Sequence, residues 1–304
     1  MRFACAKGMK KFAVYTVITN NYDELLQPKV VDDRFDYILF SDEKREDLGV
    51  WTFRPIPVVV KGDAKRLSRY PKTHPETLLA EYAASLYIDA NIQIQDQWVY
   101  DRFVELYGRN VEYAGIKLVL TGRDCIYDHA YDMCQWFLEH FQTALRQCHR
   151  LYVSGFPAHY GLNENNIIFR SHTERMRQAD EQWWQWILEY SWRDQFSYMY
   201  CLWHNQVELN YFLPEGEDAR NGRHFLLIYH DGKENVQASK LVRRSLLRRV
   251  LVKCNSLAPD KALARWTMSY RSSAPVLCYY AQSLAALLVS TPALIAALLK
   301  ANRD

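Results

Sequence analysis

The chain has 304 residues, enough for one large α/β domain with appendages or for two ordinary domains. Apolar residues at 49%, aromatic residues at 14%, and only 11 Gly and 10 Pro exclude a disordered or repetitive protein. The formal charge of +3 is too small for a dedicated nucleic-acid binder, and seven cysteines without paired spacing indicate reduced thiols rather than a disulfide framework or a zinc site.

The amino terminus predicts no export. Residues 1–11 are basic, but the apolar run Phe12–Ile18 is short and is followed by a polar turn at Asn20, without a small-residue cleavage site. A secretory signal needs a longer apolar segment and such a site. We therefore expect a cytoplasmic protein in which Phe12–Ile18 is the first strand.

Three apolar runs end in polar residues, as buried strands of an open sheet do. The runs and the residues after them are 12–18 with Thr19 and Asn20, 35–40 with Asp42, and 86–88 with Asp89. Their carboxyl ends would lie along one edge of the sheet, where open α/β folds bind nucleotides. Residues 51–58 contain two prolines, which remove ladder donors, and predict an edge strand.

Asp89 and Asn91 form a weakened Asp-x-Asp pattern directly after an apolar strand. A carboxylate and an amide at this spacing can hold a hard cation, which can in turn hold a diphosphate. The alternative is an ordinary strand-end turn, because Asp and Asn side chains also bind local backbone groups.

Residues 64–84 have a helical pattern in which four cations recur at offsets of three and four. They are Lys65, Arg66, Arg69 and Lys72. On one helix face, upstream of Asp89, they would neutralise a diphosphate. The alternative is a solvated helix face, with Glu81 paired to one of the cations.

The middle of the chain predicts a helix over 99–107, a strand over 113–120 and one long amphipathic helix that ends near residue 149. Glu164 and Asn165 then stand in a polar loop with two further amides, in front of an apolar strand. Amides offer both donor and acceptor atoms, which suits recognition of sugar hydroxyls. An ordinary turn explains the same residues.

A second candidate segment surrounds Asp194. Ser191 is a suitable helix cap, which places Asp194 and Gln195 in the first turn of the following helix, at the positive end of its dipole. Asp194 could equally complete a capping box with Ser191, and the two roles are compatible.

Several of these motifs occur in one order along the chain. They are Tyr15-Thr16 with Tyr22-Asp23, Phe40-Ser41-Asp42, the cations from Lys65 to Lys72, Glu81 through Asn91, Arg123 through Asp128, Gly161-Leu162 with Asn165, and Trp184 through Gln195. In this order they resemble a glycosyltransferase-like domain family, formerly a domain of unknown function, with bacterial surface-polysaccharide and plant Golgi members. The resemblance covers roughly residues 12–204.

The resemblance implies an α/β fold of GT-A type, a Rossmann-like mixed sheet flanked by helices, and a nucleotide-sugar donor. It implies a Mn²⁺ or Mg²⁺ cofactor, with Asp89 and Asn91 as metal and diphosphate residues. His230 would be a last metal ligand, although it could also be a strand-end histidine without a catalytic role. Asn91 replaces the commoner second Asp, which weakens the expected affinity for the metal.

The resemblance also implies roles for the remaining candidates. Arg66, Arg69 and Lys72 would bind the diphosphate, Thr19, Asn20 and Asp42 would contact the nucleoside, and Glu164, Asn165 and Gln195 would contact the donor. Asp194 would face the sugar or the acceptor. In an inverting enzyme Asp194 would take the acceptor proton, and in a retaining enzyme it would position the sugar.

The composition of the chain changes beyond about residue 213. Residues 240–253 carry six cations, no acids, and apolar residues at helical spacing, and residues 276–299 carry no charge. We therefore predict a catalytic domain over 1–235 and a helical carboxyl-terminal extension over 236–304. The extension would either lie on an anionic membrane surface, on the inner face of the cytoplasmic membrane, or pack on the domain.

Two functions remain at this point. The first is transfer of a sugar from a nucleotide-sugar donor to a glycan or lipid-linked glycan, in capsule or lipopolysaccharide synthesis. The second is a catalytically silent, membrane-attached protein that keeps the fold for binding or assembly.

Overall fold

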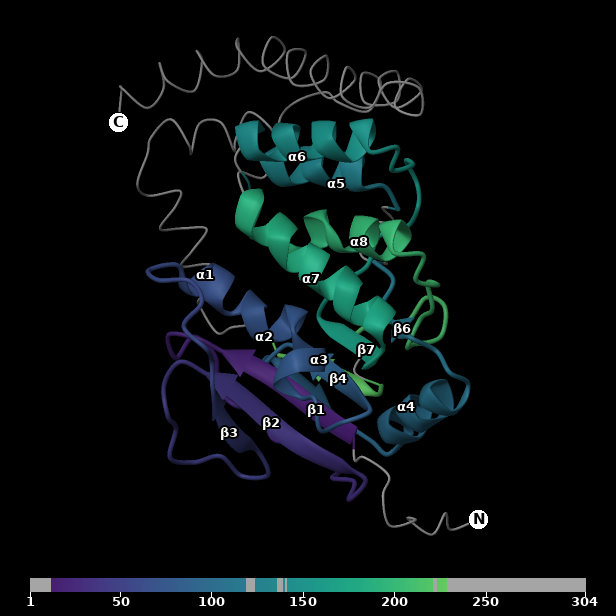
Figure 1. Cartoon of the computed structure of the whole chain (residues 1–304). Coiled ribbons are helices and arrows are strands. Elements are labelled where there is room, and N and C mark those ends of the chain that lie inside the picture. The colour runs from purple at the N-terminus through teal and green to yellow at the C-terminus, as the bar shows by residue number, and fades with distance from the viewer. Residues whose placement is uncertain (1–11, 119–123, 136–138, 140, 221–222, 229–304) are drawn as a thin grey trace, which may run out of the picture. The chain divides into compact units, whose positions relative to one another are not determined.

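The computed structural model describes residues 12–118, 124–135, 139, 141–220 and 223–228 (Figure 1). Residues 12–118, 162–220 and 223–228 form one compact unit, the sheet unit, and residues 124–135, 139 and 141–161 form a second, the helical unit. His230 and the extension 236–304 lie outside the described residues, as does the predicted boundary at 235. Within the described part of the chain, no helix is long and apolar enough to cross a bilayer.

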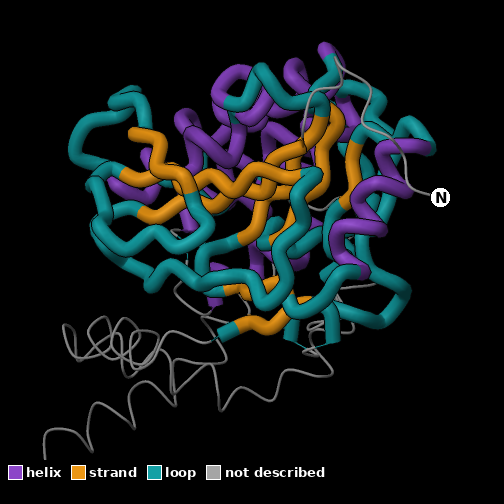
Figure 2. The backbone as a smooth tube through the Cα atoms, turned by 90° about the horizontal axis from the view of Figure 1, so that it is seen from below, coloured by secondary structure: helices purple, strands orange, loops and turns teal. Residues whose placement is uncertain are grey.

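A six-stranded mixed sheet forms the centre of the sheet unit (Figure 2). Its strands are β1 (Phe12–Ile18), β2 (Phe35–Ser41), β3 (Thr52–Pro55), β4 (Ala84–Ile88), β6 (Tyr113–Ala114) and β7 (Ile167–Ser171), in the spatial order β3-β2-β1-β4-β7-β6. β1 to β4 are parallel to one another, whereas β7 is antiparallel to β4 and β6. The α/β class and the mixed sheet are confirmed, and β3 is an edge strand as its prolines predict.

Alternate residues of the strands point to opposite faces, and each face has its own helices. On one face lies α4 (Trp98–Gly108). The ring centroid of its Phe103 is 4.9 Å from the ring centroid of Phe35 and 4.8 Å from that of Phe169. These residues belong to one buried apolar cluster that also contains Val14 and Leu86. The helix predicted over 99–107 is therefore confirmed, and its apolar side covers this face.

The opposite face of the sheet buries charge beneath α7 (Glu174–Glu189). Arg170 of β7 and Asp180 of α7 are both fully buried, and the Arg170 Nη1 donates to Asp180 Oδ2 at 2.6 Å. Arg170 Nη2 also donates to the hydroxyl of Tyr15 in β1. This polar link ties two strands to the helix that covers them.

The helix predicted over residues 64–84 is wrong in its length. The chain forms three short helices instead, α1 (Ala64–Leu67), α2 (Arg69–Thr73) and α3 (Pro75–Leu78), before β4 begins at Ala84. Asp63 caps α1, and Pro75 stands at the start of α3, where a missing backbone N–H costs least. The bends at Ser68 and His74 mean that the four cations do not share one straight helix face.

The strand predicted over 113–120 is shorter than expected. β6 is Tyr113–Ala114, and isolated bridges continue at Gly115 and Lys117. A small antiparallel ribbon of β5 (Ile92–Ile94) and β8 (Phe225–Leu227) lies outside the main sheet. The turn η1 (Asp194–Phe196) and α8 (Tyr198–His204) complete the described part of the sheet unit.

The helical unit contains α5 (Ile126–Gln135) and α6 (Phe141–Val153) in place of one long helix. The Glu139 N–H donates to the carbonyl of Met133, six residues earlier, at 3.2 Å. The amphipathic pattern has no proline or glycine between these helices, so it does not show where the first one ends.

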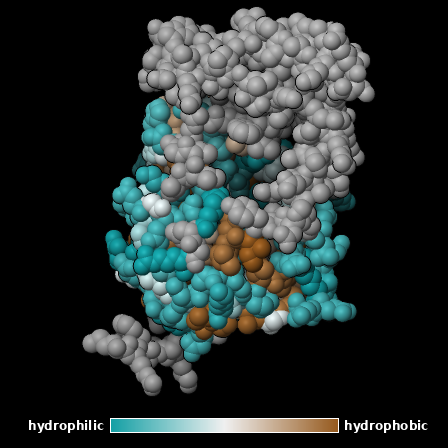
Figure 3. All heavy atoms as spheres, turned by 180° about the vertical axis from the view of Figure 1, so that it is seen from behind, coloured by the Kyte–Doolittle hydropathy of each residue, from teal (hydrophilic) through white to brown (hydrophobic). Residues whose placement is uncertain are grey.

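Apolar side chains also reach the surface. Figure 3 shows them gathered in a band on one face, between polar side chains. The exposed large apolar residues include Leu226 in β8 and Ile228 just after it, at 36% and 41% exposure.

Candidate nucleotide-sugar site

The carboxyl ends of β1, β2 and β4 lie along one edge of the sheet, because the three strands are parallel neighbours. The chain runs outward from β1 through β2 to β3 and then returns to the other side of β1 as β4. The strand order therefore reverses between β1 and β4. In open α/β sheets, ligands bind in the crevice at this point.

The loop after β1 is held in place by the end of β2. Asn20 and Asn21 have φ angles of 52° and 49°, a left-handed conformation that Asn adopts more readily than most residues. The Asn20 N–H donates to both carboxylate oxygens of Asp42, at 3.0 and 3.1 Å. The Thr19 hydroxyl donates to the carbonyl of Ala64 in α1 at 3.4 Å. The structure thus brings together three residues that the sequence assigns to the nucleoside.

A second group of candidates meets around the Lys72 ammonium, which is 2% exposed. Lys72 Nζ lies 2.5 Å from Asp194 Oδ2 and 3.7 Å from Asp89 Oδ1. The Tyr87 hydroxyl donates to the same Asp89 oxygen at 2.6 Å, and the Tyr87 ring centroid lies 4.6 Å from Lys72 Nζ. Asp89 and Asp194 are 105 positions apart and share one cation.

Arg69 extends this group toward Trp192. The Arg69 Nε lies 3.6 Å from Asp194 Oδ2, and its guanidinium carbon lies 5.7 Å from the Trp192 ring centroid. Lys65 and Arg193 contact the same ring, at 4.5 and 4.9 Å. Cations are attracted to an indole ring, which here holds three of them close together.

We call the charged residues of this region the rim cluster. Its members are Asp63, Lys65, Arg66, Arg69, Lys72, Asp89, Arg193 and Asp194. Asp63 joins it through Arg66, whose Nη1 lies 2.7 Å from Asp63 Oδ2.

The electrostatic environment keeps Asp194 ionised. Burial alone would raise the pKa of its carboxyl, but the Lys72 ammonium and then the Arg69 guanidinium outweigh burial and lower that pKa below its usual value. Burial and the Asp89 charge raise the pKa of Tyr87 well above its usual value. Tyr87 therefore stays protonated and donates its hydrogen bond to Asp89.

Arg66 is turned away from the position expected of a phosphate ligand. Its Nε donates to the carbonyl of Ile187 at 2.9 Å, and its Nη2 donates to the carbonyl of Tyr190 at 2.9 Å. With Nη1 on Asp63, all three nitrogens have protein partners. Arg66 joins α1 to the carboxyl end of α7 and so helps to position the cluster.

The loop before β7 lies beside Asp89, whose backbone N–H donates to the carbonyl of Asn166 at 2.8 Å. Glu164 is buried and accepts from Arg220 Nη1 at 2.6 Å, so it anchors residues 218–220 to this loop. Asn165 is 4% exposed, and neither polar atom of its side chain has a hydrogen-bond partner among the described residues. Gln195 is half-buried next to Asp194.

A metal ion fits this edge poorly. The Asp89 carboxylate already accepts from Tyr87 and faces the Lys72 ammonium, and the Asn91 amide donates to the Ile228 carbonyl at 3.2 Å. Among the described residues, no three His, Cys, Asp or Glu side chains are grouped to hold a metal. A divalent ion at Asp89 would lie close to a buried ammonium and would be repelled by it. His230, the last predicted metal ligand, lies outside the described residues.

Sequence reasoning missed Tyr87, Trp192, Arg193 and Arg220. Tyr87 could have been found from strand periodicity, because it precedes Asp89 by two and shares its face. Trp192 and Arg193 stand next to the predicted Asp194 segment, but nothing local indicates that they meet residues near position 65. The Arg220 contact with Glu164 spans 56 positions and leaves no local signal.

The predicted pairing of Glu81 with a cation of residues 65–72 is wrong. Glu81 Oε1 accepts instead from Arg54 Nη2 at 2.5 Å, next to the edge strand β3.

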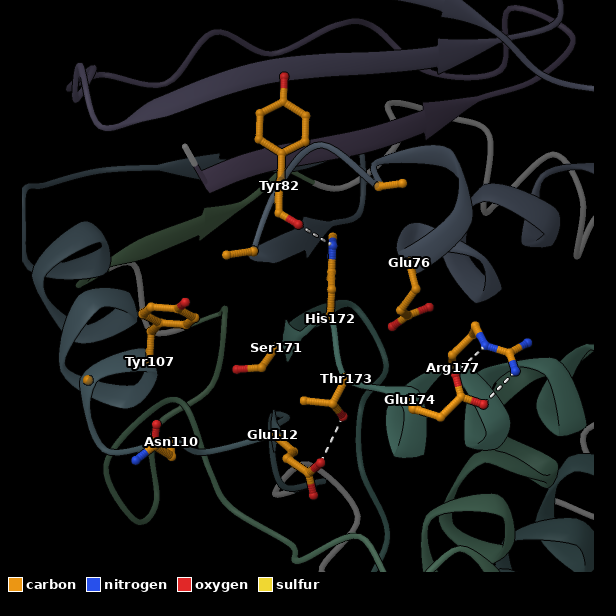
Figure 4. A pocket seen from close by; sticks show the side chains of 13 residues that line it. Glu76, Tyr82, Tyr107, Asn110, Glu112, Ser171, His172, Thr173, Glu174 and Arg177 are labelled. Atoms are coloured by element: carbon orange, nitrogen blue, oxygen red, sulfur yellow. Dashed lines mark hydrogen bonds and ion pairs between the residues drawn. The ribbon is translucent and has the colours of Figure 1, made fainter. Parts of the chain in front are cut away.

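A separate hollow of about 650 Å³ lies where β4 begins and β7 ends, at the opposite end of β4 from Asp89 (Figure 4). Its polar side chains largely bind one another. The Thr173 hydroxyl donates to Glu112 at 2.7 Å, and Arg177 makes two bonds to Glu174. Both ring nitrogens of His172 have oxygen partners, the carbonyl of Tyr82 and the hydroxyl of Ser85. Several of the polar groups that line this hollow are therefore already paired within the protein.

No family model matches the chain, and no curated protein matches it. Among solved structures, it is similar to the galactosyltransferase LgtC in complex with donor and acceptor sugar analogs, with 11% identity over 66% of this chain and 72% of that chain and a TM-score of 0.36. It is similar to core-mannan synthase A from Aspergillus fumigatus in its Mn/GDP form, with 10% identity, 69% and 74% coverage and a TM-score of 0.43.

A third similar structure is the mannosyltransferase PcManGT from Pyrobaculum calidifontis in complex with GDP-Man and Mn²⁺. It has 12% identity, covers 97% of this chain and 87% of that chain, and gives a TM-score of 0.34. By name, all three proteins transfer sugars or synthesise a glycan. At these identities and TM-scores the likeness carries no conclusion about activity, and the fold class rests on the strand order and directions described above.

Proposed function

We propose that the protein is a GT-A-type glycosyltransferase that moves a sugar from a nucleotide-sugar donor to a glycan acceptor. One observation carries the proposal: the Asp89–Lys72–Asp194–Arg69 network lies at the carboxyl edge of β4, beside the point where the strand order reverses. Open α/β folds bind phosphorylated ligands in this position. Buried and partly buried cations there favour a ligand with concentrated negative charge.

In this proposal the donor lies across the edge from β1 to β7. The diphosphate contacts Lys72 and Arg69, and the nucleoside lies against the loops that carry Asn20 and Asp42. The sugar faces Asn165, whose buried and unpaired amide offers two N–H donors and a carbonyl acceptor. A buried polar group without a partner costs stability unless a ligand or water satisfies it.

In the reaction, an acceptor hydroxyl oxygen forms a bond to the anomeric carbon, and the bond from that carbon to the diphosphate oxygen breaks. The nucleoside diphosphate leaves with both bonding electrons, Lys72 and Arg69 stabilise its new charge, and the proton of the acceptor hydroxyl is released to water. Asp194 has a lowered pKa and holds Lys72, so it serves better as a positioning residue than as the base that takes the hydroxyl proton.

Thermal shift with a panel of nucleoside diphosphates and sugar nucleotides tests the proposal. A donor that binds the native state must raise the melting temperature, by an amount that grows with its concentration above Kd. We expect a shift with at least one nucleotide and a loss of that shift in Lys72→Met, which removes a cation assigned to the diphosphate. Glu105→Gln, on the solvated side of α4, is the control and should keep the shift. No shift with any nucleotide would contradict the proposal.

The same panel addresses a second function, a catalytically silent binding protein. The ion-paired state of Asp89 and Asp194 and the Asn91 replacement favour it. A nucleotide that binds without turnover in the presence of candidate glycan acceptors, while the sugar remains on the donor, would support that alternative over the enzyme.

We place this activity in the synthesis of a bacterial capsule or lipopolysaccharide, at the cytoplasmic face of a membrane that presents a lipid-linked glycan. The basic residues of 240–253 support this placement through their charge pattern alone. Replacing Arg243, Arg244, Arg248 and Arg249 by Gln in the full chain should move the protein from the membrane to the soluble fraction of cells. If the variant pellets with membranes as the parent does, this part of the proposal fails.

A further inference from the structure

We infer that the rim cluster meets the donor's diphosphate with its own cations, so that nucleotide binding does not need a divalent metal. The inference rests on the proposed function and specifies the chemistry of its donor site. It differs from the expectation that the sequence gives through Asp89 and Asn91, and it follows from what surrounds Asp89 in the structure.

The charge of the cluster suits a diphosphate. Lys65, Arg66, Arg69, Lys72 and Arg193 are five cations, and Asp63, Asp89 and Asp194 are three carboxylates, which leaves an excess of two positive charges. A diphosphate diester, as in a nucleotide sugar, is doubly negative. The cluster and its ligand would therefore be neutral together, without a metal ion.

Lys72 lies beside Asp89, the carboxylate that would have to hold a metal ion. Its ammonium lies 3.7 Å from Asp89 Oδ1 and is almost completely buried, so it cannot leave for solvent without moving α2. A divalent ion on Asp89 would bring two further positive charges next to the Lys72 ammonium and would be repelled by it. An ammonium has three N–H donors, and Asp194 takes one of them at 2.5 Å, while Asp89 faces another. One donor remains for a phosphate oxygen.

Arg69 supplies further donors. Its Nε is buried, lies 3.6 Å from Asp194 Oδ2 and makes no hydrogen bond within the described part of the chain. Its Nη1 donates to the Ser68 hydroxyl at 3.1 Å. A guanidinium has five N–H donors, so most of the Arg69 donors are available to a ligand. Arginine binds phosphate oxygens in pairs, which fixes the orientation of the ligand.

The Trp192 ring explains how like charges are kept together in the absence of a ligand. Lys65, Arg69 and Arg193 lie within 6 Å of its centroid from three positions in the chain. Their mutual repulsion opposes this arrangement, and attraction to the ring offsets part of it. An anion bound among them would relieve the repulsion, and this strengthens the case for a phosphate group here.

Isothermal titration calorimetry with UDP and GDP, on the full chain, tests the inference. We expect the nucleotide that binds to keep its Kd within about twofold between a buffer with EDTA and a buffer with Mn²⁺. Because the contacts are charged, the Kd should rise as salt is added. A Kd that rises at least tenfold in EDTA and recovers with Mn²⁺ would overturn the inference while leaving the proposed function intact.

Variants give a second and independent result. Lys72→Met and Arg69→Gln should each weaken nucleotide binding about tenfold or more, and Mn²⁺ should not restore it. Lys117→Met is the matched control, because Lys117 also lies over a tyrosine ring, that of Tyr211, at 6.0 Å. It should bind as the parent does. Tight binding by the folded Arg69→Gln variant would also contradict the inference, and no binding by the parent under any condition would overturn the proposed function itself.

Discussion

Lys72 shows how one side chain can organise a site. Burying an ammonium is costly unless charged partners compensate for the lost water, and here Asp194, Asp89 and the Tyr87 ring do so. Removal of one partner would leave a buried charge without sufficient compensation. The two carboxylates are therefore fixed by the same requirement that fixes the lysine.

The charge of Asp194 should make a pH-dependent contribution to stability. Because Lys72 and Arg69 lower the pKa of this carboxyl in the folded state, its contribution is present above the unfolded pKa of about 3.9 and is lost as the pH falls through the folded value. We predict that Asp194→Asn lowers the free energy of unfolding by about 2 kcal/mol at pH 7.

Urea unfolding at pH 7 and at pH 3 measures this effect. The difference between Asp194→Asn and the parent should shrink at the lower pH. Asp101→Asn is the control, because that carboxylate is 60% exposed in its pair with Arg34 and should change little at either pH. An equal loss for Asp194→Asn at both pH values would argue against the assigned ion pair.

The pKa of the Glu76 carboxyl is shifted in the opposite direction to that of Asp194. Burial, and then the nearby Asp180 charge, raise the pKa of its carboxyl well above the usual value. A raised pKa means that the carboxyl favours folding at low pH and that this contribution is lost as the pH rises through the folded value. We predict that Glu76→Gln, which keeps the shape without the charge, raises the melting temperature at pH 8 and has a smaller effect at pH 5. A lower melting temperature at pH 8 would contradict this account.

At the scale of elements, the buried pair of Arg170 and Asp180 joins α7 to the sheet. α7 also carries Trp183, whose Nε1 donates to the Asp194 carbonyl at 3.0 Å. The same helix therefore supports the sheet and holds the segment that carries Asp194. Loosening α7 should affect both stability and the site.

Asp180→Ala should lower the free energy of unfolding by about 3–5 kcal/mol, because it leaves a buried guanidinium without its carboxylate. Chemical denaturation followed by circular dichroism measures the loss. Glu174→Ala removes one partner of a second pair on the same helix, between side chains 50% and 63% exposed, and should leave the midpoint unchanged. Similar losses in both variants would show that burial of the pair is not what matters.

The elements differ in how well the sequence predicts them. β1, β2 and β4 are apolar runs with clear polar ends. The sequence places β1 and β2 within a residue, whereas β4 begins at Ala84, two residues before the predicted run. The bends at Ser68 and His74 are not visible in a pattern of cations at helical spacing, because that pattern continues through them. The end of α5 is likewise not visible in the sequence, because no glycine or proline stands between α5 and α6.

At the scale of the whole molecule, the sequence predicts that β1, β2 and β4 end along one edge, where Asn20, Asp42 and Asp89 lie, but not the spatial order of the strands. What could not be expected are contacts between distant segments. Lys72 meets Asp194 across 122 positions, and Arg66 meets the carbonyl of Tyr190 across 124. Such contacts depend on how α7 packs on α1 and α2, which no local pattern specifies.

The site residues also differ in whether local pattern or distant contacts decide their role. The sequence identified Asp89, Asp194, Arg69 and Lys72, and the structure brings all four together. It assigned phosphate binding to Arg66 and contact with the sugar donor to Glu164, but the polar side-chain atoms of both residues form hydrogen bonds within the protein. Residue type and spacing indicate which side chains are charged, and only the fold shows which charges are left for a ligand.

The most direct test of the proposed function is a crystal structure of the protein with the nucleoside diphosphate that binds it. We predict that the diphosphate lies within hydrogen-bond distance, about 2.7–3.2 Å, of Lys72 Nζ and the Arg69 guanidinium, with the nucleoside beside Asn20 and Asp42. A nucleotide bound instead in the hollow beside His172 and Glu112, at the other end of β4, would contradict the proposed function and the site assigned to it.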